Sequence, residues 1–264
     1  MALCLLLAGC AEKQAGERVV PPDWPEVPAN IIDLTHAYDE STIFWPTDTQ
    51  GFDLEVVAAG VTDQGYYYSA NRFATAEHGG THLDAPVHFY ETGWTADEIP
   101  VERLVGHGVV LDVSEKAAND RDYQVNVEDF ELWEKMHGRL PTGAIVLLRT
   151  GYGRFWGDRL NYLGTEKEGE AAIPELHFPG LHPSAATWLK NERSIRAIGL
   201  DTPSIDYGQS TDFKSHVILM SGNIPAFENV ANLDKLPNTG FLVVALPMKI
   251  AGGSGGPLRI IAMW

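Results

Sequence analysis

The chain has 264 residues, of which 44% are hydrophobic and 21% charged, and this composition is typical of one large globular domain. Its formal net charge of −17 excludes the basic surface on which nucleic-acid binding depends, and no apolar run approaches the roughly 20 residues of a membrane-spanning helix. Both cysteines lie in the first ten residues, which excludes a disulfide framework and a thiol-based site in the rest of the chain.

The first ten residues, MALCLLLAGC, combine an apolar run with small residues before Cys10. This pattern is typical of a secretion signal, and Leu7-Ala8-Gly9-Cys10 resembles a bacterial lipobox, whose cysteine is lipidated and becomes the mature N-terminus. The alternative is an ordinary small apolar N-terminus. We therefore expect a lipoprotein-like signal over residues 1–10, a periplasmic protein anchored by lipid at Cys10, and a polar, proline-rich tether over residues 11–30.

Residues 31–264 are predicted to form a single domain, since they contain no internal repeat and no second linker. Short runs rich in β-branched and apolar residues predict strands at 30–35, 52–58, 108–113, 144–150, 195–201, 216–220, 241–250 and 258–264. Residues 126–138 and 182–192 have the spacing of amphipathic helices. The predicted fold class is α/β, with a mixed, partly barrel-like sheet at the core and a few flanking helices.

The stretch EHGGTHLDAPVHF, residues 77–89, concentrates three histidines and one aspartate where the backbone is least regular. Two glycines between His78 and His82 disfavour a helix, whereas a strand would point His82 and Asp84 to the same side. The glycines would also let the backbone fold His78 back over that side. Two imidazoles and one carboxylate that converge in this way are suitable ligands for Zn²⁺ or Mn²⁺.

The alternative interpretation of these histidines is a buried, hydrogen-bonded core or a polar surface loop. It suits a lone histidine, but burying three histidines and an aspartate without partners would be costly. Three protein ligands leave a metal open to water, whose pKa the metal lowers toward neutrality. A second, distant pair could complete the site: His216 begins a β-rich run, and Glu228 follows the turn Ser221-Gly222-Asn223.

The stretch HGGTHLDAPVHF resembles the H-x-G-T-H-x-D-x-P-x-H-F signature of the cyclase family, which includes bacterial kynurenine formamidase and isatin hydrolase. The resemblance is not confined to this signature. Similar segments are IIDLTHAYDESTIFWPTD at 31–48, LLRTGYGRFWG at 147–157, AIGLDTPSID at 197–206, SHVILMSGNIPAFENVANLDKLP at 215–237 and FLVVALPMKIAGGSGGPLRIIAM at 241–263. It therefore extends over nearly all of the chain from residue 31.

The resemblance implies a metal-dependent hydrolase of amide-type bonds with a mixed α/β fold, holding one or two divalent ions, Zn or Mn. The implied ligands are His78, His82 and Asp84, with His216 and Glu228 on the far side. Asp84 bridges the ions in two-metal members, whereas the second pair holds water or substrate in one-metal members. The resemblance also implies that His88 is the acid–base residue, that Asp201 supports the ligands, and that the protein is a homodimer or larger homo-oligomer.

The expected substrate is a small aromatic amide, either an aryl formamide such as N-formylkynurenine or a cyclic amide such as isatin. An exported protein fits poorly with tryptophan breakdown in the cytosol, so other formanilides and lactones stay open. Phe44, Trp45, Phe73 and Tyr90 could form walls of the substrate pocket, although ordinary core packing is the alternative for each. Two other functions stay open as well: a metal-assisted cyclase or dehydratase, and a non-catalytic, metal-dependent periplasmic binding protein.

Overall fold

Seven strands close into a ring in the computed structural model of the chain, which describes residues 27–264. Around the ring, the order is β12–β11–β5–β7–β9–β10–β4, and β4 pairs again with β12. These strands span Gly255–Met263 (β12), Phe241–Pro247 (β11), Val105–Asp112 (β5), Ile145–Arg149 (β7), Ala197–Leu200 (β9), Ala226–Glu228 (β10) and His82–Asp84 (β4). The neighbours from β5 to β10 are parallel and the other pairs antiparallel, so the expected mixed, barrel-like sheet is confirmed.

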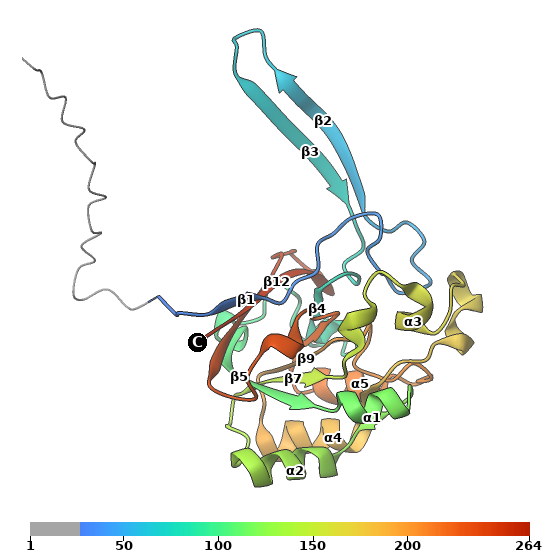
Figure 1. Cartoon of the computed structure of the whole chain (residues 1–264), viewed down its shortest axis with the longest axis vertical. Helices are drawn as coiled ribbons and strands as arrows, with labels where there is room; N and C mark the ends of the chain where they lie inside the picture. The colour runs from blue at the N-terminus through green and yellow to red at the C-terminus, as the bar shows by residue number, and fades with distance from the viewer. Residues whose placement is uncertain (1–26) are drawn as a thin grey trace, which may run out of the picture.

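Two hydrophobic clusters lie on opposite sides of this sheet. One is built from strand residues all around the ring, including Leu83, Val110, Leu147, Phe227 and Phe241, and it fills the inside. In the other, the alternate strand residues pack against helices α2 (Val127–His137) and α4 (Pro183–Trp188), which lie side by side below the ring in Figure 1. The parallel strands β5, β7, β9 and β10 are thus largely buried on both faces, whereas β11 and β12 keep one face partly exposed.

The predicted helices over 126–138 and 182–192 are confirmed as α2 and as α4 with a π-helical continuation over Leu189–Arg193. Asn126 and Asp129 form a capping box at the start of α2, and Gly138 ends it with a φ of 87°. The remaining α-helices are α1 (Ser114–Asn119), α3 (Arg159–Leu163) and α5 (Lys214–Met220). Single 3₁₀ turns lie at Pro86–His88, Val101–Arg103, Tyr152–Phe155, Gly169–Ala171, Ile173–Glu175 and Leu233–Lys235.

The strand predicted at 216–220 is wrong, because this segment is the helix α5. Its buried residues are Ser215, His216, Leu219 and Met220, a spacing that follows one face of a helix. A run of four apolar residues does not by itself distinguish a buried helix from a buried strand. Within residues 27–264, no helix has the length and apolar character to cross a membrane.

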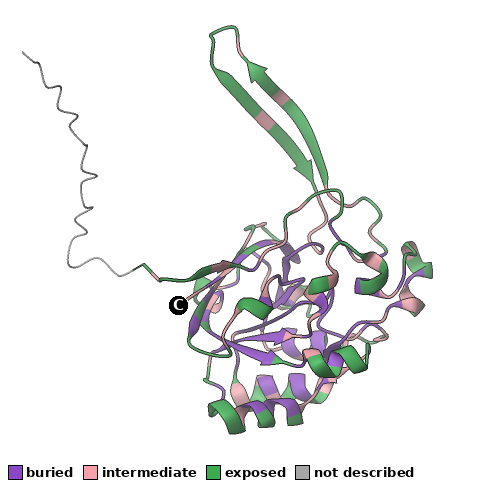
Figure 2. Cartoon of the chain, in the orientation of Figure 1, coloured by how far each residue is buried: buried purple, intermediate pink, exposed green. Residues whose placement is uncertain are grey.

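A long hairpin projects from the body (Figure 1) and is formed by β2 (Asp53–Val61) and β3 (Tyr67–Ala74). Nearly all of its residues are exposed on both faces (Figure 2). The other strands are β1 (Ile31–Asp33), which pairs with β12, and the short pair β6 (Gln124–Val125) and β8 (Gly180–Leu181). The signal expected over residues 1–10 and most of the tether expected over 11–30 lie outside the described residues.

Candidate metal centre

The first half of the centre is formed by the histidine-rich stretch itself. In β4, His82 and Asp84 point to the same side, with His82 Nε2 at 3.1 Å from Asp84 Oδ1. His78 returns to this side, so that its Nδ1 lies 2.6 Å from the same carboxylate oxygen. The spatial arrangement expected from the strand and the glycines is therefore confirmed. The ligand roles of the three residues stay predictions.

The two glycines of the stretch are required by close packing. A Cβ at Gly79 would lie 2.0 Å from the ring of Phe44, and a Cβ at Gly80 would lie 2.6 Å from the ring of Tyr38. Gly80 also has a φ of +57°, in the left-handed region that favours glycine. The N-terminal segment that carries Phe44 and Tyr38 is thereby held directly against the turn that returns His78.

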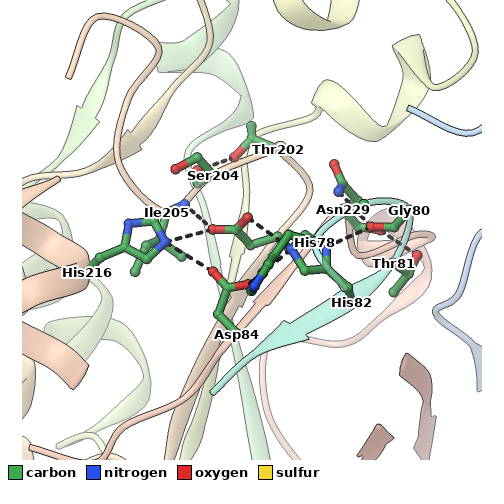
Figure 3. A network of polar contacts seen from close by, with 12 residues as sticks. His78, Gly80, Thr81, His82, Asp84, Thr202, Ser204, Ile205, His216 and Asn229 are labelled. Atoms are coloured by element: carbon green, nitrogen blue, oxygen red, sulfur yellow. Dashed lines mark hydrogen bonds and ion pairs between the residues drawn. The ribbon is translucent and has the colours of Figure 1, made fainter. Parts of the chain in front are cut away.

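The second half comes from distant parts of the chain. His216 projects from α5, and its Nε2 lies 3.2 Å from Asp84 Oδ2 and 3.2 Å from Glu228 Oε1. Glu228 is brought here by sheet pairing, because β10 runs antiparallel to β4 with Glu228 opposite His82. Figure 3 shows both halves meeting at Asp84. The expected approach of His216 to Glu228 is confirmed, although His216 lies in a helix and not in a strand.

Each imidazole uses its other nitrogen for a different partner outside the centre. His82 Nδ1 lies 3.0 Å from the carbonyl oxygen of Gly80, and His216 Nδ1 lies 2.6 Å from Asp206 Oδ2. His78 Nε2 lies 2.9 Å from Ser254 Oγ. The nitrogens that face Asp84 are therefore Nε2 of His82, Nε2 of His216 and Nδ1 of His78.

Asp206 and Ser254 are site residues that the sequence analysis missed. Asp206 ends the segment 197–206, whose resemblance to the family drew attention only to Asp201. Ser254 is the one non-glycine residue in GGSGG, a composition that indicates close approach of the loop to another part of the chain. That signal predicts a contact but does not identify its partner.

The electrostatics of the centre favour additional positive charge. Burial alone would lower the pKa of His82, but the carboxylates of Asp84 and Glu228 outweigh it and raise this pKa to about 9. Burial, and then repulsion from Asp84, raises the pKa of Glu228. Burial opposes the charge on Asp84, yet the neighbouring histidines hold its pKa well below the usual range. The two buried carboxylates thus favour positive charge beside them.

A divalent metal fits this set of residues. His78, His82 and Asp84 offer three ligand atoms within 4.8 Å of one another, and so do Asp84, His216 and Glu228. Imidazole nitrogens and carboxylate oxygens are ligands of Zn²⁺ and suit Mn²⁺. The different partners of the three imidazoles leave the nitrogens in the centre available for the metal. The residues therefore support a divalent metal, and its identity stays a prediction.

His88 lies beside both halves but outside the two ligand groups. After β4, the 3₁₀ turn Pro86–His88 redirects the chain, and the ring of His88 stacks on that of His78 with centroids 3.8 Å apart. Burial, partly offset by the charge of Asp84, lowers the pKa of His88 to about 4. His88 is therefore neutral at pH 7 and can accept a proton.

The residues of the centre line a cavity of about 360 Å³, a size that suits a small organic ligand. Of the four aromatic residues predicted to form its walls, Phe44 and Trp45 line it, whereas Phe73 and Tyr90 do not. Phe73 belongs to β3 of the exposed hairpin, and Tyr90 is 40% exposed. The sequence analysis missed two further aromatic residues that line it, Phe89 and Phe213. Phe89 directly follows His88, so its place in the motif was a usable signal.

Asp201 lies apart from the ligand atoms. Its carboxylate accepts hydrogen bonds from the backbone and hydroxyl of Thr150 and from the amide of Gly151, at 2.6 to 2.9 Å. Its peptide carbonyl lies 3.2 Å from the hydroxyl of Tyr162, which also contacts Asn229, the neighbour of Glu228. Any support that Asp201 gives to the ligands is therefore indirect, and this role stays a prediction.

Comparison with known proteins agrees with the fold and with the site. A family model described as "Putative cyclase" matches residues 32–207, more than half of the chain. The chain belongs to the cyclase family. It is 32% identical to an isatin hydrolase of Roseibium aggregatum over 208 residues, an alignment that covers 75% of this chain and 76% of the relative. It is 26% identical over 231 residues to a kynurenine formamidase of Salinibacter ruber, covering 88% and 96%.

The fold is shared with solved structures of the same family. An isatin hydrolase bound to the product analogue thioisatinate superposes with a TM-score of 0.79 and 29% sequence identity, covering 89% of this chain and 92% of that chain. The family predicted from the sequence is thus confirmed. Its relatives are hydrolases that act on C–N bonds of small aromatic substrates.

Proposed function

We propose that this chain hydrolyses a small aromatic amide, either an aryl formamide or a cyclic amide such as isatin, with the help of divalent metal. The observation that carries the proposal is the meeting of two groups of possible ligands at Asp84, in a cavity that is also lined by aromatic side chains. Isatin hydrolase and kynurenine formamidase are the named activities of relatives. Both reactions break an amide C–N bond next to an aromatic ring.

Two ions per chain, Zn²⁺ or Mn²⁺, are part of the proposal. His78 and His82 face one oxygen of Asp84, and His216 faces the other, so the carboxylate can serve both groups at once. Bound metal would polarise the substrate carbonyl and make water more acidic. Metal analysis of the purified protein distinguishes two ions from one.

The side chains around the centre have separate tasks in this reaction. Phe44, Phe89 and Phe213 give the cavity apolar walls, against which an aromatic ring can pack while bulk water is excluded. His88, neutral at pH 7, accepts the proton that the attacking water loses. It then donates this proton to the nitrogen that leaves as the C–N bond breaks. The products are a carboxylate and an aryl amine, which stay joined when the substrate is a ring.

Turnover of a substrate panel tests the proposal. The purified protein, loaded with Zn²⁺ or Mn²⁺, is given isatins, formanilides and lactones in ¹⁸O water. We expect metal-dependent turnover of an aromatic amide, with the label in the new carboxylate. Product without label would instead support a cyclase or dehydratase, and ligand-dependent stabilisation without any product would support a binding protein. Either outcome would contradict hydrolysis.

We also propose a homo-oligomer in which the β2–β3 hairpin contacts a second copy of the chain. The hairpin exposes Leu54, Val56, Val57, Val61, Tyr66, Tyr67, Tyr68 and Phe73 by half or more. An isolated two-stranded hairpin is marginally stable, and contiguous exposed apolar surface is typical of interfaces. Light scattering is expected to show a dimer or larger species in the wild type and a monomer in Val56→Lys/Tyr67→Lys. Leu132→Lys, on the exposed face of α2, is the control that should stay assembled.

Export and lipid attachment at Cys10 are proposals that rest on the sequence, since these residues lie outside the described range. When the chain is expressed in a bacterium, the wild type should partition into detergent, and Cys10→Ser should not. If both proteins remain in the aqueous phase, the lipid anchor is rejected.

A further inference from the structure

The outer nitrogen of His78 is bound differently from those of the other two histidines. His78 Nε2 contacts the hydroxyl of Ser254 at 2.9 Å, and this hydroxyl donates its proton to Glu77 Oε2 at 2.6 Å. A hydroxyl has one proton to donate. Because that proton is directed to Glu77, Ser254 Oγ can only accept at His78, and Nε2 must carry hydrogen. Nδ1, which lies 2.6 Å from Asp84 Oδ1, is then the nitrogen that a bound metal would contact in place of the proton that it directs to this carboxylate.

The backbone around Ser254 fixes the hydroxyl in this position. The amide of Ser254 also donates to Glu77 Oε2 at 3.0 Å, and its carbonyl accepts from the amide of Ala85 at 2.8 Å. The next residue, Gly255, pairs with Asp84 where β12 meets β4. Ser254 is thus held between Glu77 and the strand that carries two of the proposed ligands.

The glycines beside Ser254 allow this close approach. A Cβ at Gly253 would lie 2.7 Å from Glu77 Oε1, and a Cβ at Gly255 would lie 2.7 Å from Cε1 of His78. The ring of His78 therefore lies directly on the backbone of Gly255, with the ring of His88 stacked 3.8 Å away. Only small residues on either side of Ser254 leave room for both the carboxylate and the imidazole.

We propose that Ser254 and Glu77 are positioning residues, which hold His78 in the tautomer that presents the Nδ1 lone pair to the metal. This inference rests on the metal site of the proposed function and adds to it the residues that set the orientation of one ligand. Glu77 acts through Ser254: its charge orients the hydroxyl, and the hydroxyl holds the ring. Partners of this kind change metal affinity by about 10–100-fold when they are removed.

The first test is competition for Zn²⁺ between the loaded protein and a chelator of known affinity. Ser254→Ala should bind Zn²⁺ about 10–100-fold more weakly than the wild type. Ser254→Cys, which keeps the size of the side chain but offers only a weak acceptor, should show a loss of the same order. Ser254→Thr, which keeps the hydroxyl, should restore most of the affinity. Ser221→Ala, whose hydroxyl contacts Lys190, is the control that should match the wild type.

A double-mutant cycle and a spectroscopic readout separate positioning from packing. Glu77→Gln alone should weaken Zn²⁺ binding, but adding it to Ser254→Ala should cost little more, because both act through one hydroxyl. The ¹⁵N spectrum of His78 in the Zn²⁺-loaded wild type should show protonated Nε2. Ser254→Ala and Glu77→Gln should both speed the exchange of this Nε2 proton with solvent in the Zn²⁺-loaded protein, because the hydrogen bond to Ser254 is lost or weakened.

The outcomes distinguish this inference from the proposed function. A wild type that binds no Zn²⁺ or Mn²⁺ would overturn the metal site itself. A wild type that binds Zn²⁺, together with Ser254→Ala of equal affinity and unchanged exchange of the His78 Nε2 proton, would overturn only the positioning role. Additive losses in the double-mutant cycle would also overturn it, because they would show that Glu77 acts independently of Ser254.

Discussion

The two halves of the metal centre use similar ligands but are held by different chemistry. In the C-terminal half, the carboxylate of Asp206 lies 2.6 Å from Nδ1 of His216. In the N-terminal half, the carbonyl of Gly80 and the hydroxyl of Ser254 contact the outer nitrogens of His82 and His78. Hydrogen bonds to a charged group contribute about 1.5–3 kcal/mol, against about 0.5–1.5 kcal/mol for neutral pairs. His216 should therefore be the more firmly held and more basic ligand.

The two halves carry their outer carboxylates at different distances from the histidines. Burial lowers the pKa of His216, but the hydrogen bonds that its ring donates to Asp206, Asp84 and Glu228 outweigh burial and raise this pKa well above the usual value. The N-terminal half keeps its own outer carboxylate, Glu77, one hydroxyl further away. If two ions bind, the ion in the C-terminal half would therefore lie closer to outer negative charge than the ion in the N-terminal half.

The largest expected effect comes from the one residue that both halves share. Asp84→Asn removes the charge to which both groups of ligands are directed, so we expect loss of bound metal and of detectable turnover. The measurement is metal content by elemental analysis, alongside activity and circular dichroism. Asp129→Asn is the matched control, because Asp129 is also buried but bonds to Tyr123. A folded Asp84→Asn protein with full metal content would show that the halves do not meet at Asp84.

Replacement of His88 tests whether this residue, which lies beside both halves, acts as an acid–base group and not as a metal ligand. His88→Ala should keep its metal and fold but lose roughly 10²–10⁴ in kcat, the usual contribution of a positioned acid–base group. The measurement is kcat with metal content, and His107→Ala, at an exposed position on β5, is the control. Loss of metal from His88→Ala would make His88 a ligand. Normal turnover would require another proton acceptor.

Asp206→Asn sharpens the comparison between the halves. The amide keeps the shape of the carboxylate but lacks its charge, so His216 should be held less firmly. Of the two proposed ions, the one in the C-terminal half should then be lost first. We expect an affinity loss of about 10–100-fold for that ion and little change for the other. Stepwise chelation measures both affinities, and Asp122→Asn, which affects the half-exposed His177, is the control. Equal weakening of both ions would show that the halves are coupled.

The smallest expected effect is on the pH dependence of folding stability, through His36 beside the N-terminal half. His36 donates its backbone amide to Thr81 and stacks on Trp156 with centroids 4.1 Å apart. Burial lowers its pKa from 6.5 to about 4. As the pH falls from 6.5 toward 4, the unfolded chain therefore binds a proton that the folded chain does not, and stability decreases.

His36→Phe keeps the stacking but does not titrate, so its melting temperature should fall by less than that of the wild type between pH 7 and pH 5. Thermal unfolding of the two proteins at both pH values measures this difference. Parallel decreases would show that His36 is protonated equally in the folded and unfolded states.

The N-terminal half could be predicted from the sequence because its geometry is local. His82 and Asp84 are two residues apart in a strand, and the glycines account for the return of His78. Seven of the eight expected strands and the helices α2 and α4 were predicted for a similar reason, since their patterns repeat over neighbouring residues. Most element types and the convergence of His78, His82 and Asp84 thus followed from short-range rules, whereas the type of α5 did not.

The C-terminal half could not be derived in the same way. His216 meets Asp84 across 132 residues, and this contact depends on the packing of α5 and on the register between β10 and β4. The pair His216 and Glu228 was expected mainly from the family resemblance. Asp206 and Ser254 are single polar residues without a periodic pattern, and their partners are fixed only when the ring has closed.

Closure of the ring by β4 and β12 has a consequence for the order of folding. This pairing places His78 against Ser254, residues that are separated by 176 positions. Contacts of such long range form slowly, because a large loop must be ordered before they contribute. The polar centre should therefore assemble late, after the parallel strands β5, β7 and β9 have packed. Metal that binds only the closed ring would then slow its opening, so that chelation should shorten the lifetime of the folded protein.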